Sequence, residues 1–183
     1  MPPSAVKTIE DLIFWQYAKI ISESAKFGKT NYRFIMSKFK ELQSGQIHWS
    51  TSIREYIEER EKKDRCIYCG GKDRLTLDHI LPKSRGGPDS PDKAVWVCQK
   101  CNSSKGSKRL YEWRGLENKD EYDRIAEGKY LKLLHKLHEE KRTLNLSEVK
   151  ELCVNCDMPD LCKKDDVVGK LTVYCLEGCF KKI

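Results

Sequence analysis

The sequence predicts an α+β protein in which a small β-containing unit lies between two helical regions. Three observations support this fold class. Apolar residues recur at helical spacing before residue 62 and again over 122–142, two short β-like runs lie between two closely spaced cysteine pairs, and further cysteines gather in the tail. The domain boundaries that follow are 1–62 for an N-terminal helical region, 63–115 for the central unit, and 116–183 for a helical and cysteine-rich C-terminal region.

The composition indicates a folded protein with a basic centre. Of 183 residues, 39% are hydrophobic and 34% charged, and no run reaches the ~20 apolar residues that a membrane helix needs. The net charge is +7, and the stretch from Lys62 to Arg114, with 13 Lys/Arg and 6 Asp/Glu, accounts for it. This local excess favours nucleic acid as a partner, or else a solubilising surface. Residues 1–4 lack the features of a signal peptide, so we expect a cytoplasmic protein with no membrane partner.

The first 62 residues are predicted to form three helices with apolar and aromatic core faces. Gly28 separates the first from the second, which Asn31 can cap. Gly45 ends the second, and Ser50 or Thr51 can cap a third.

A further helix is predicted from Tyr122 to Arg142, with its leucines on one buried side. His135 and His138 are three positions apart on this helix and could share a ligand. No glutamate-containing zinc motif surrounds them, so a solvated helix face is favoured.

The first cysteine group has the spacing of a metal site. Cys66-x-x-Cys69 and Cys98-x-x-Cys101 are two pairs with 28 residues between them. Nine cysteines is an odd number, and with no export signal they favour metal thiolates over disulfides. Two such pairs supply the four sulfurs of a structural zinc site, and a plain zinc ribbon would have the same cysteines.

Residues between and beside these pairs have the chemistry of a hydrolytic centre. Asp78-His79 follows the first β-like run, and Asn102 follows the last cysteine of the group, with Lys105 three residues later. Carboxylate and amide oxygens suit Mg²⁺ or Mn²⁺ and leave positions for water and phosphate. His79 has the side-chain type that takes a proton from water near neutral pH. Lys105 lies about one helical turn from Asn102 and can meet phosphate charge.

The chain resembles a known family in three runs: 66–69 (CIYC), 77–87 (LDHILPKSRGG) and 98–106 (CQKCNSSKG). They are similar to the branch of the HNH (ββα-metal) endonucleases that is held together by zinc between two CxxC pairs, and the likeness covers roughly residues 62–114. The resemblance implies a ββα fold with one catalytic divalent metal bound by Asp78 and Asn102. It implies His79 as the general base, Lys105 as a phosphate or transition-state contact, and products with 5′-phosphate and 3′-hydroxyl ends.

One position departs from the family pattern. Five residues before the third cysteine the family usually has an asparagine that holds the loop between the strands, and this chain has Lys93. Lysine accepts no hydrogen bond, so the loop must be held differently, for instance through Asp92.

The tail contains a second cysteine group with five thiols. We expect Cys153, Cys156, Cys162 and Cys175 to form a second metal site, with Cys179 as a possible substitute for either of the later two. Zinc is favoured, because Cys₄ zinc sites are the commoner solution in small units. The C-x2-C-x5-C spacing is also similar to that of iron–sulfur nucleases of the RecB type, so an iron–sulfur cluster stays open. The expected cofactors are one or two structural zinc ions and a catalytic Mg²⁺ or Mn²⁺.

The predicted function is an endonuclease that hydrolyses phosphodiester bonds, with double-stranded DNA as the expected partner. The alternative is a non-catalytic, zinc-dependent nucleic-acid-binding module, which would not need Asp78, His79 and Asn102 together. A third possibility is a subunit of a larger complex that docks through its N-terminal helices. A homodimer would suit cleavage of both strands, but no residue argues for one.

Overall fold

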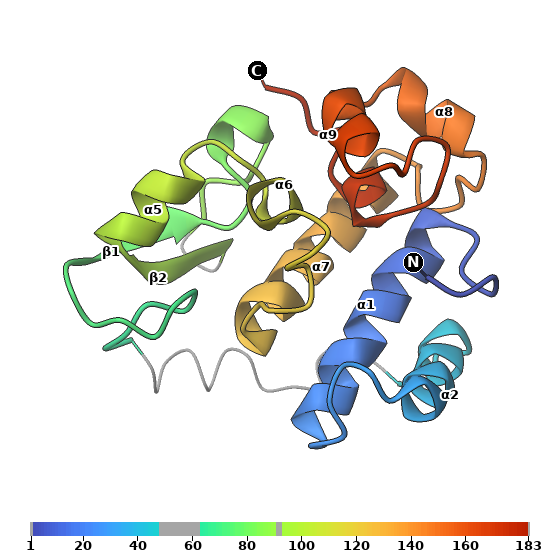
Figure 1. The fold of residues 1–183 in the computed structure, drawn as a ribbon, viewed down its shortest axis with the longest axis horizontal. Helices are drawn as coiled ribbons and strands as arrows, with labels where there is room; N and C mark the ends of the chain where they lie inside the picture. Colours follow the sequence, from blue (N-terminus) through green and yellow to red (C-terminus); the bar gives the residue numbers. More distant parts are fainter. Residues whose placement is uncertain (1, 48–62, 91–92, 183) are drawn as a thin grey trace.

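The computed structural model describes residues 2–47, 63–90 and 93–182 and confirms an α+β fold (Figure 1). Its elements are α1 (Ile9–Ser24), α2 (Tyr32–Gln43), β1 (Leu75–His79), the short 3₁₀ helix η1 (Lys83–Arg85), β2 (Ala94–Cys98), α5 (Gln99–Lys105), α6 (Leu110–Arg114), α7 (Arg124–Glu140), α8 (Val149–Val154), α9 (Pro159–Lys164) and the 3₁₀ helix η3 (Val173–Leu176). The predicted third helix of the N-terminal region and Asp92 lie outside the described residues. None of the helices in the described part is long and apolar enough to cross a membrane.

Helix α1 forms the centre of the helical half of the molecule, between α2 and α7 (Figure 1). Thr8 begins it with a capping box, in which its hydroxyl accepts from the backbone N–H of Asp11 and the Asp11 carboxylate accepts from the N–H of Thr8. The aromatic side chains of Trp15 and Tyr17 are buried. Burial of these rings confirms that they belong to the core.

Helix α7 begins at the cap Asp123 and packs along α1. The prediction of a solvated histidine face is wrong for His138, which is fully buried. One of its ring nitrogens lies 3.0 Å from the carbonyl of Leu176 and the other 2.7 Å from the Thr143 hydroxyl, and burial lowers its pKa to about 4. His135 instead lies 3.2 Å from Glu10. The two histidines therefore have separate partners and do not share a site.

The β-containing unit is an antiparallel hairpin with a helix packed on it. The strand register runs from Leu75 opposite Cys98 to His79 opposite Ala94, and α5 contacts both strands. In Figure 1 the hairpin and α5 lie at the opposite side of the molecule from α1 and α2, with α6 and α7 between them. The hairpin thus places the start of α5 beside the start of β1, and Lys105 at the end of α5 contacts Asp78 and the carbonyl of His79 at the end of β1.

A buried arginine joins the C-terminal region to this unit. Arg109 precedes α6, and its guanidinium donates to the Asp157 carboxylate at 2.6 Å and to the carbonyls of Glu177 and Phe180 at 2.9 and 3.0 Å. Its remaining partner is Glu112, one turn along α6. A charge that is 1% exposed persists only with such complete pairing.

Glu177 makes the reciprocal connection from the tail to α6. Its buried carboxylate accepts from the backbone N–H groups of Tyr111 and Glu112, at 2.6 and 2.9 Å, and from the hydroxyl of Tyr130. These are N–H groups in the first turn of α6, which has no earlier turn to bond them. The cysteine-rich tail therefore supplies part of the packing and the helix cap of the central unit.

Candidate metal centre and active site

The first cysteine group has the geometry of a tetrahedral metal site. The sulfurs of its four members all lie within 4.8 Å of one another, and the Sγ atoms of Cys69 and Cys98 are 3.7 Å apart. Zinc–sulfur bonds of about 2.3 Å place tetrahedral sulfurs about 3.8 Å from one another. The four predicted ligands, Cys66, Cys69, Cys98 and Cys101, therefore fit a zinc ion.

Local backbone hydrogen bonds fix the positions of the two cysteine pairs. Cys98 is the N-cap of α5, and its sulfur accepts from the backbone N–H of Cys101 at 3.4 Å, which helps to lower the pKa of Cys98 to about 7. The first pair is attached to β2, because the N–H of Ile67 donates to the carbonyl of Trp96 at 2.9 Å. A metal bound here would hold both ends of the hairpin unit together.

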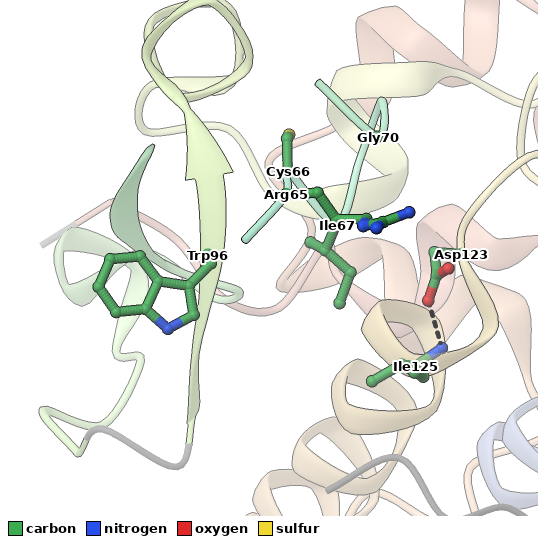
Figure 2. Close-up of a pocket in the computed structure, with 7 residues that line it drawn as sticks. All are labelled: Arg65, Cys66, Ile67, Gly70, Trp96, Asp123 and Ile125. Atoms are coloured by element: carbon green, nitrogen blue, oxygen red, sulfur yellow. Dashed lines mark hydrogen bonds between the residues drawn. The ribbon is translucent and has the colours of Figure 1, made fainter. Parts of the chain in front are cut away.

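A cavity of about 120 Å³ lies between the first cysteine pair and the start of α7. Figure 2 shows Ile67 and Trp96 on one side and Asp123 and Ile125 on the other, with the cap bond from the Ile125 N–H to Asp123 drawn as a dashed line. None of the four predicted catalytic residues lines this cavity. The predicted catalytic residues therefore lie outside this cavity.

Asp78 and His79 are neighbours on β1, so their side chains point to opposite faces of the hairpin. Asp78 is buried at 7% exposure. The hydroxyl of Tyr68 donates to its Oδ2 at 3.1 Å, and the ammonium of Lys105 lies 3.0 Å from Oδ1 and 2.9 Å from Oδ2. Asp78 is therefore a buried carboxylate paired with a buried cation.

His79 ends β1 with its ring in contact with solvent. Its side chain is 27% exposed, and its Nε2 lies 3.4 Å from a carboxylate oxygen of Asp89 in the loop that follows β1. The same oxygen lies 2.6 Å from the ammonium of Lys83. The imidazole is thus partly exposed, and the ion pair of Asp89 and Lys83 lies beside it.

Lys105 is placed differently from the prediction of a phosphate contact. It ends α5, and its side chain has no exposed surface. Besides Asp78, its ammonium donates to the carbonyl of His79 at 3.0 Å. Burial lowers the pKa of Lys105, and the Asp78 carboxylate opposes that shift. In this position Lys105 compensates the charge of Asp78 and holds the end of β1.

Asp78 and Asn102 are the predicted ligands of a hard divalent cation, and both carry oxygen donors. A carboxylate has about four lone-pair positions, and three contacts from Lys105 and Tyr68 reach Asp78. Asn102 is half-buried on α5, which packs against β1, and its amide can supply a second oxygen. Such a site leaves most of the coordination sphere to water and phosphate oxygens, as Mg²⁺ prefers.

The loop between the strands lacks the asparagine that is usual in the family. Gly87 and Arg85 restrict its conformation instead. A Cβ at Gly87 would lie 1.9 Å from the carbonyl oxygen of Leu81, so the backbone approaches there too closely for any side chain. Arg85 bonds the carboxylates of Glu112 and Asp157. The two carboxylates that bond Arg85 lie 27 and 72 residues further along the chain, so remote residues hold this part of the loop.

Gly87→Ala should distort this loop and destabilise the protein by about 2–3 kcal/mol, because its Cβ would overlap a backbone atom. Gly86→Ala is the matched control: nothing lies within 4 Å of its Cβ, and its φ of +81° alone should cost about 1 kcal/mol. Urea unfolding of the two variants checks this. Equal midpoints would contradict the close approach at Gly87.

Two of the arginines that the composition assigns to a basic surface form ion pairs within the protein. Arg109 is buried, and Arg85 is held by carboxylates, so neither is free to reach phosphate. The exposed cations of the described part of this unit are Lys63, Arg65, Lys72, Arg74, Lys83, Lys100 and Lys108. Sequence alone missed the roles of Arg85 and Arg109, because their partners lie up to 72 residues away.

Four of the five cysteines of the tail line one cavity. They are Cys153 in α8, Cys156 after it, Cys162 in α9 and Cys175 in η3. Burial raises the pKa of Cys162 to about 11, and the neighbouring thiols of Cys175, Cys156 and Cys153 add to the rise. Cys179 lines a different pocket. The four that share the cavity are the set first chosen from spacing.

Residues 66–112 match the model of a family described as HNH endonuclease. This segment is 47 of the 183 residues. Neither a comparison with curated proteins nor one with solved structures gives a match. The matched segment contains both CxxC pairs, the β1–β2 hairpin and α5, with Asp78, His79 and Asn102 at their expected places in chain order. The four-cysteine centre and the ββα arrangement of this central segment are consistent with the HNH endonuclease family whose model it matches.

Proposed function

We propose that this protein is a metal-dependent endonuclease that cleaves DNA, with His79 as its general base. The observation that carries the proposal is the position of His79: it ends the first strand of a ββα unit in a segment of the HNH endonuclease family, and its ring is open to solvent. A general base needs both access to water and a fixed place beside the scissile bond. The hairpin fixes the position of His79, and the partly exposed ring gives it access to water.

In the proposed reaction, a ring nitrogen of His79 accepts a proton from a water molecule whose oxygen attacks the phosphorus. The bond from phosphorus to the 3′ oxygen breaks, and that oxygen takes a proton from solvent, which leaves a 5′-phosphate and a 3′-hydroxyl. Asp78 and Asn102 would hold Mg²⁺ or Mn²⁺, which supplies charge stabilisation at the phosphoryl oxygens. A carboxylate oxygen of Asp89 lies 3.4 Å from Nε2 of His79 and can orient the ring through a hydrogen bond.

One observation favours the second candidate, a non-catalytic module that binds nucleic acid through zinc-organised structure. The ammonium of Lys105 contacts both oxygens of Asp78 and already neutralises the charge that a catalytic cation would meet. The exposed cations of the unit would serve binding without chemistry equally well.

Incubation with supercoiled plasmid, single-stranded DNA and RNA, each with Mg²⁺, with Mn²⁺ or with excess EDTA, separates the two functions. The proposal expects nicked or linear plasmid with a divalent metal and none with EDTA. Metal-dependent cleavage of RNA but not of DNA would support nuclease activity and show that DNA is not the substrate. Binding of DNA without cleavage under any of these metals would reject the nuclease and leave the binding module.

A further inference from the structure

The cavity lined by the four tail cysteines carries an inference that is independent of the nuclease proposal. It measures about 170 Å³ and lies among α8, α9 and η3. Apart from the cysteines, its walls include apolar side chains such as Leu152, Pro159, Val167 and Val168. Four thiols that face one apolar cavity from three separate elements are an unusual use of cysteine unless they bind a common group.

The spacing of these sulfurs differs from that of the first cysteine group. Among the described residues, the group of Cys66 and its partners is the one set of three or more Cys, His, Asp or Glu residues whose ligand atoms all lie within 4.8 Å of one another. No three of the four tail sulfurs of the described chain meet that limit. A single zinc ion needs all four sulfurs about 3.8 Å apart, and the four sulfurs of the first group come close to this, all within 4.8 Å of one another. The tail sulfurs are therefore spread more widely, around a cavity.

The backbone around Cys156 leaves room for its thiol and donates a hydrogen bond to it. A Cβ at Gly178 would lie 2.3 Å from the sulfur of Cys156, so only glycine leaves room for that thiol. The N–H of Met158 donates to the same sulfur at 3.3 Å. Hydrogen bonds from backbone N–H groups to sulfur stabilise thiolate ligands and are one of the means by which proteins tune iron–sulfur centres.

We propose that Cys153, Cys156, Cys162 and Cys175 bind an iron–sulfur cluster in this cavity. A cluster places its own iron and sulfide ions between the thiolates, so it needs widely spaced sulfurs and an enclosed volume, whereas a zinc ion needs neither. Cys179 is not a ligand, since it lines another pocket with Lys141 and Phe180.

The position of the cluster gives it a structural effect on the central unit. Asp157 follows the ligand Cys156 directly, and its carboxylate bonds both Arg85 and Arg109. Glu177 lies two residues after the ligand Cys175 and caps α6. The cluster would therefore fix the two acidic residues that hold the β1–β2 loop and α6.

Metal and sulfide analysis of the full chain, purified without oxygen, tests the proposal directly. We expect about one zinc per chain together with iron and acid-labile sulfide in equal amounts, about two to four of each, and a broad visible absorption. Two zinc ions per chain with no iron or sulfide, also after anaerobic incubation with iron and sulfide, would overturn it. Iron without sulfide would overturn it as well.

Matched variants locate the site. Cys153→Ala should lose the iron, the sulfide and the visible absorption while it retains one zinc, and Cys179→Ala should keep all of them. Loss of the absorption in Cys179→Ala but not in Cys153→Ala would contradict the assigned ligands. If Cys153→Ala does not fold, the analysis of the unmodified chain still decides the presence of a cluster.

Discussion

His79→Ala should lower the rate of plasmid cleavage by about 10²–10⁴-fold, the usual contribution of a positioned general base. The fold should not suffer, because the ring is partly exposed and the described contact of its side chain is with an exposed carboxylate, Asp89. The measurement is the initial rate of nicking at saturating Mg²⁺, with zinc content and thermal unfolding recorded for each protein.

His135→Ala is the matched control for this experiment. His135 also lies near a carboxylate, that of Glu10, but it is on α7 and outside the HNH segment. The His135→Ala variant should cleave plasmid at the rate of the unmodified protein. A His79→Ala variant that retains full activity with intact zinc would remove His79 from the reaction, even if the protein is a nuclease.

The parts of the fold that sequence predicted correctly are those that local spacing determines. Each CxxC pair brings two sulfurs to one turn, and an antiparallel hairpin between the pairs brings the turns together, so the four-cysteine centre follows from short-range geometry. The same applies to α1 and α2, which their apolar runs predict, and to Asn31, the predicted cap that begins α2.

Sequence could not predict contacts between charged residues far apart in the chain. Arg85 and Arg109 belong to the basic stretch that favours a nucleic-acid partner. Both instead pair with Asp157 in the tail, more than forty residues later. His138 was assigned to a solvated face because nothing near it in sequence shows that the carbonyl of Leu176 will cover it. Burial of polar side chains depends on how remote segments pack, and residue type alone does not carry that information.

The ion pair between Asp78 and Lys105 leads to the second large effect. Lys105→Met should destabilise the protein by about 3–5 kcal/mol, because it leaves the Asp78 carboxylate buried with the Tyr68 hydroxyl as its remaining partner among the contacts described above. Lys108→Met, an exposed lysine three residues later, is the matched control and should change the stability by less than about 0.5 kcal/mol. Urea unfolding at constant zinc content measures both.

A double-mutant cycle with Asp78→Asn then separates charge compensation from phosphate binding. In the Asp78→Asn background no buried carboxylate remains, so Lys105→Met should destabilise the protein much less than in the unmodified chain, with a coupling free energy of about 1–3 kcal/mol. If Lys105 served phosphate alone, its replacement would weaken DNA binding and leave the unfolding free energy unchanged in both backgrounds. The structure predicts the first outcome, because the Lys105 ammonium has no exposed surface and lies 2.9 Å from Asp78. Lys105 would then act on catalysis through Asp78, as a positioning residue, rather than through the substrate.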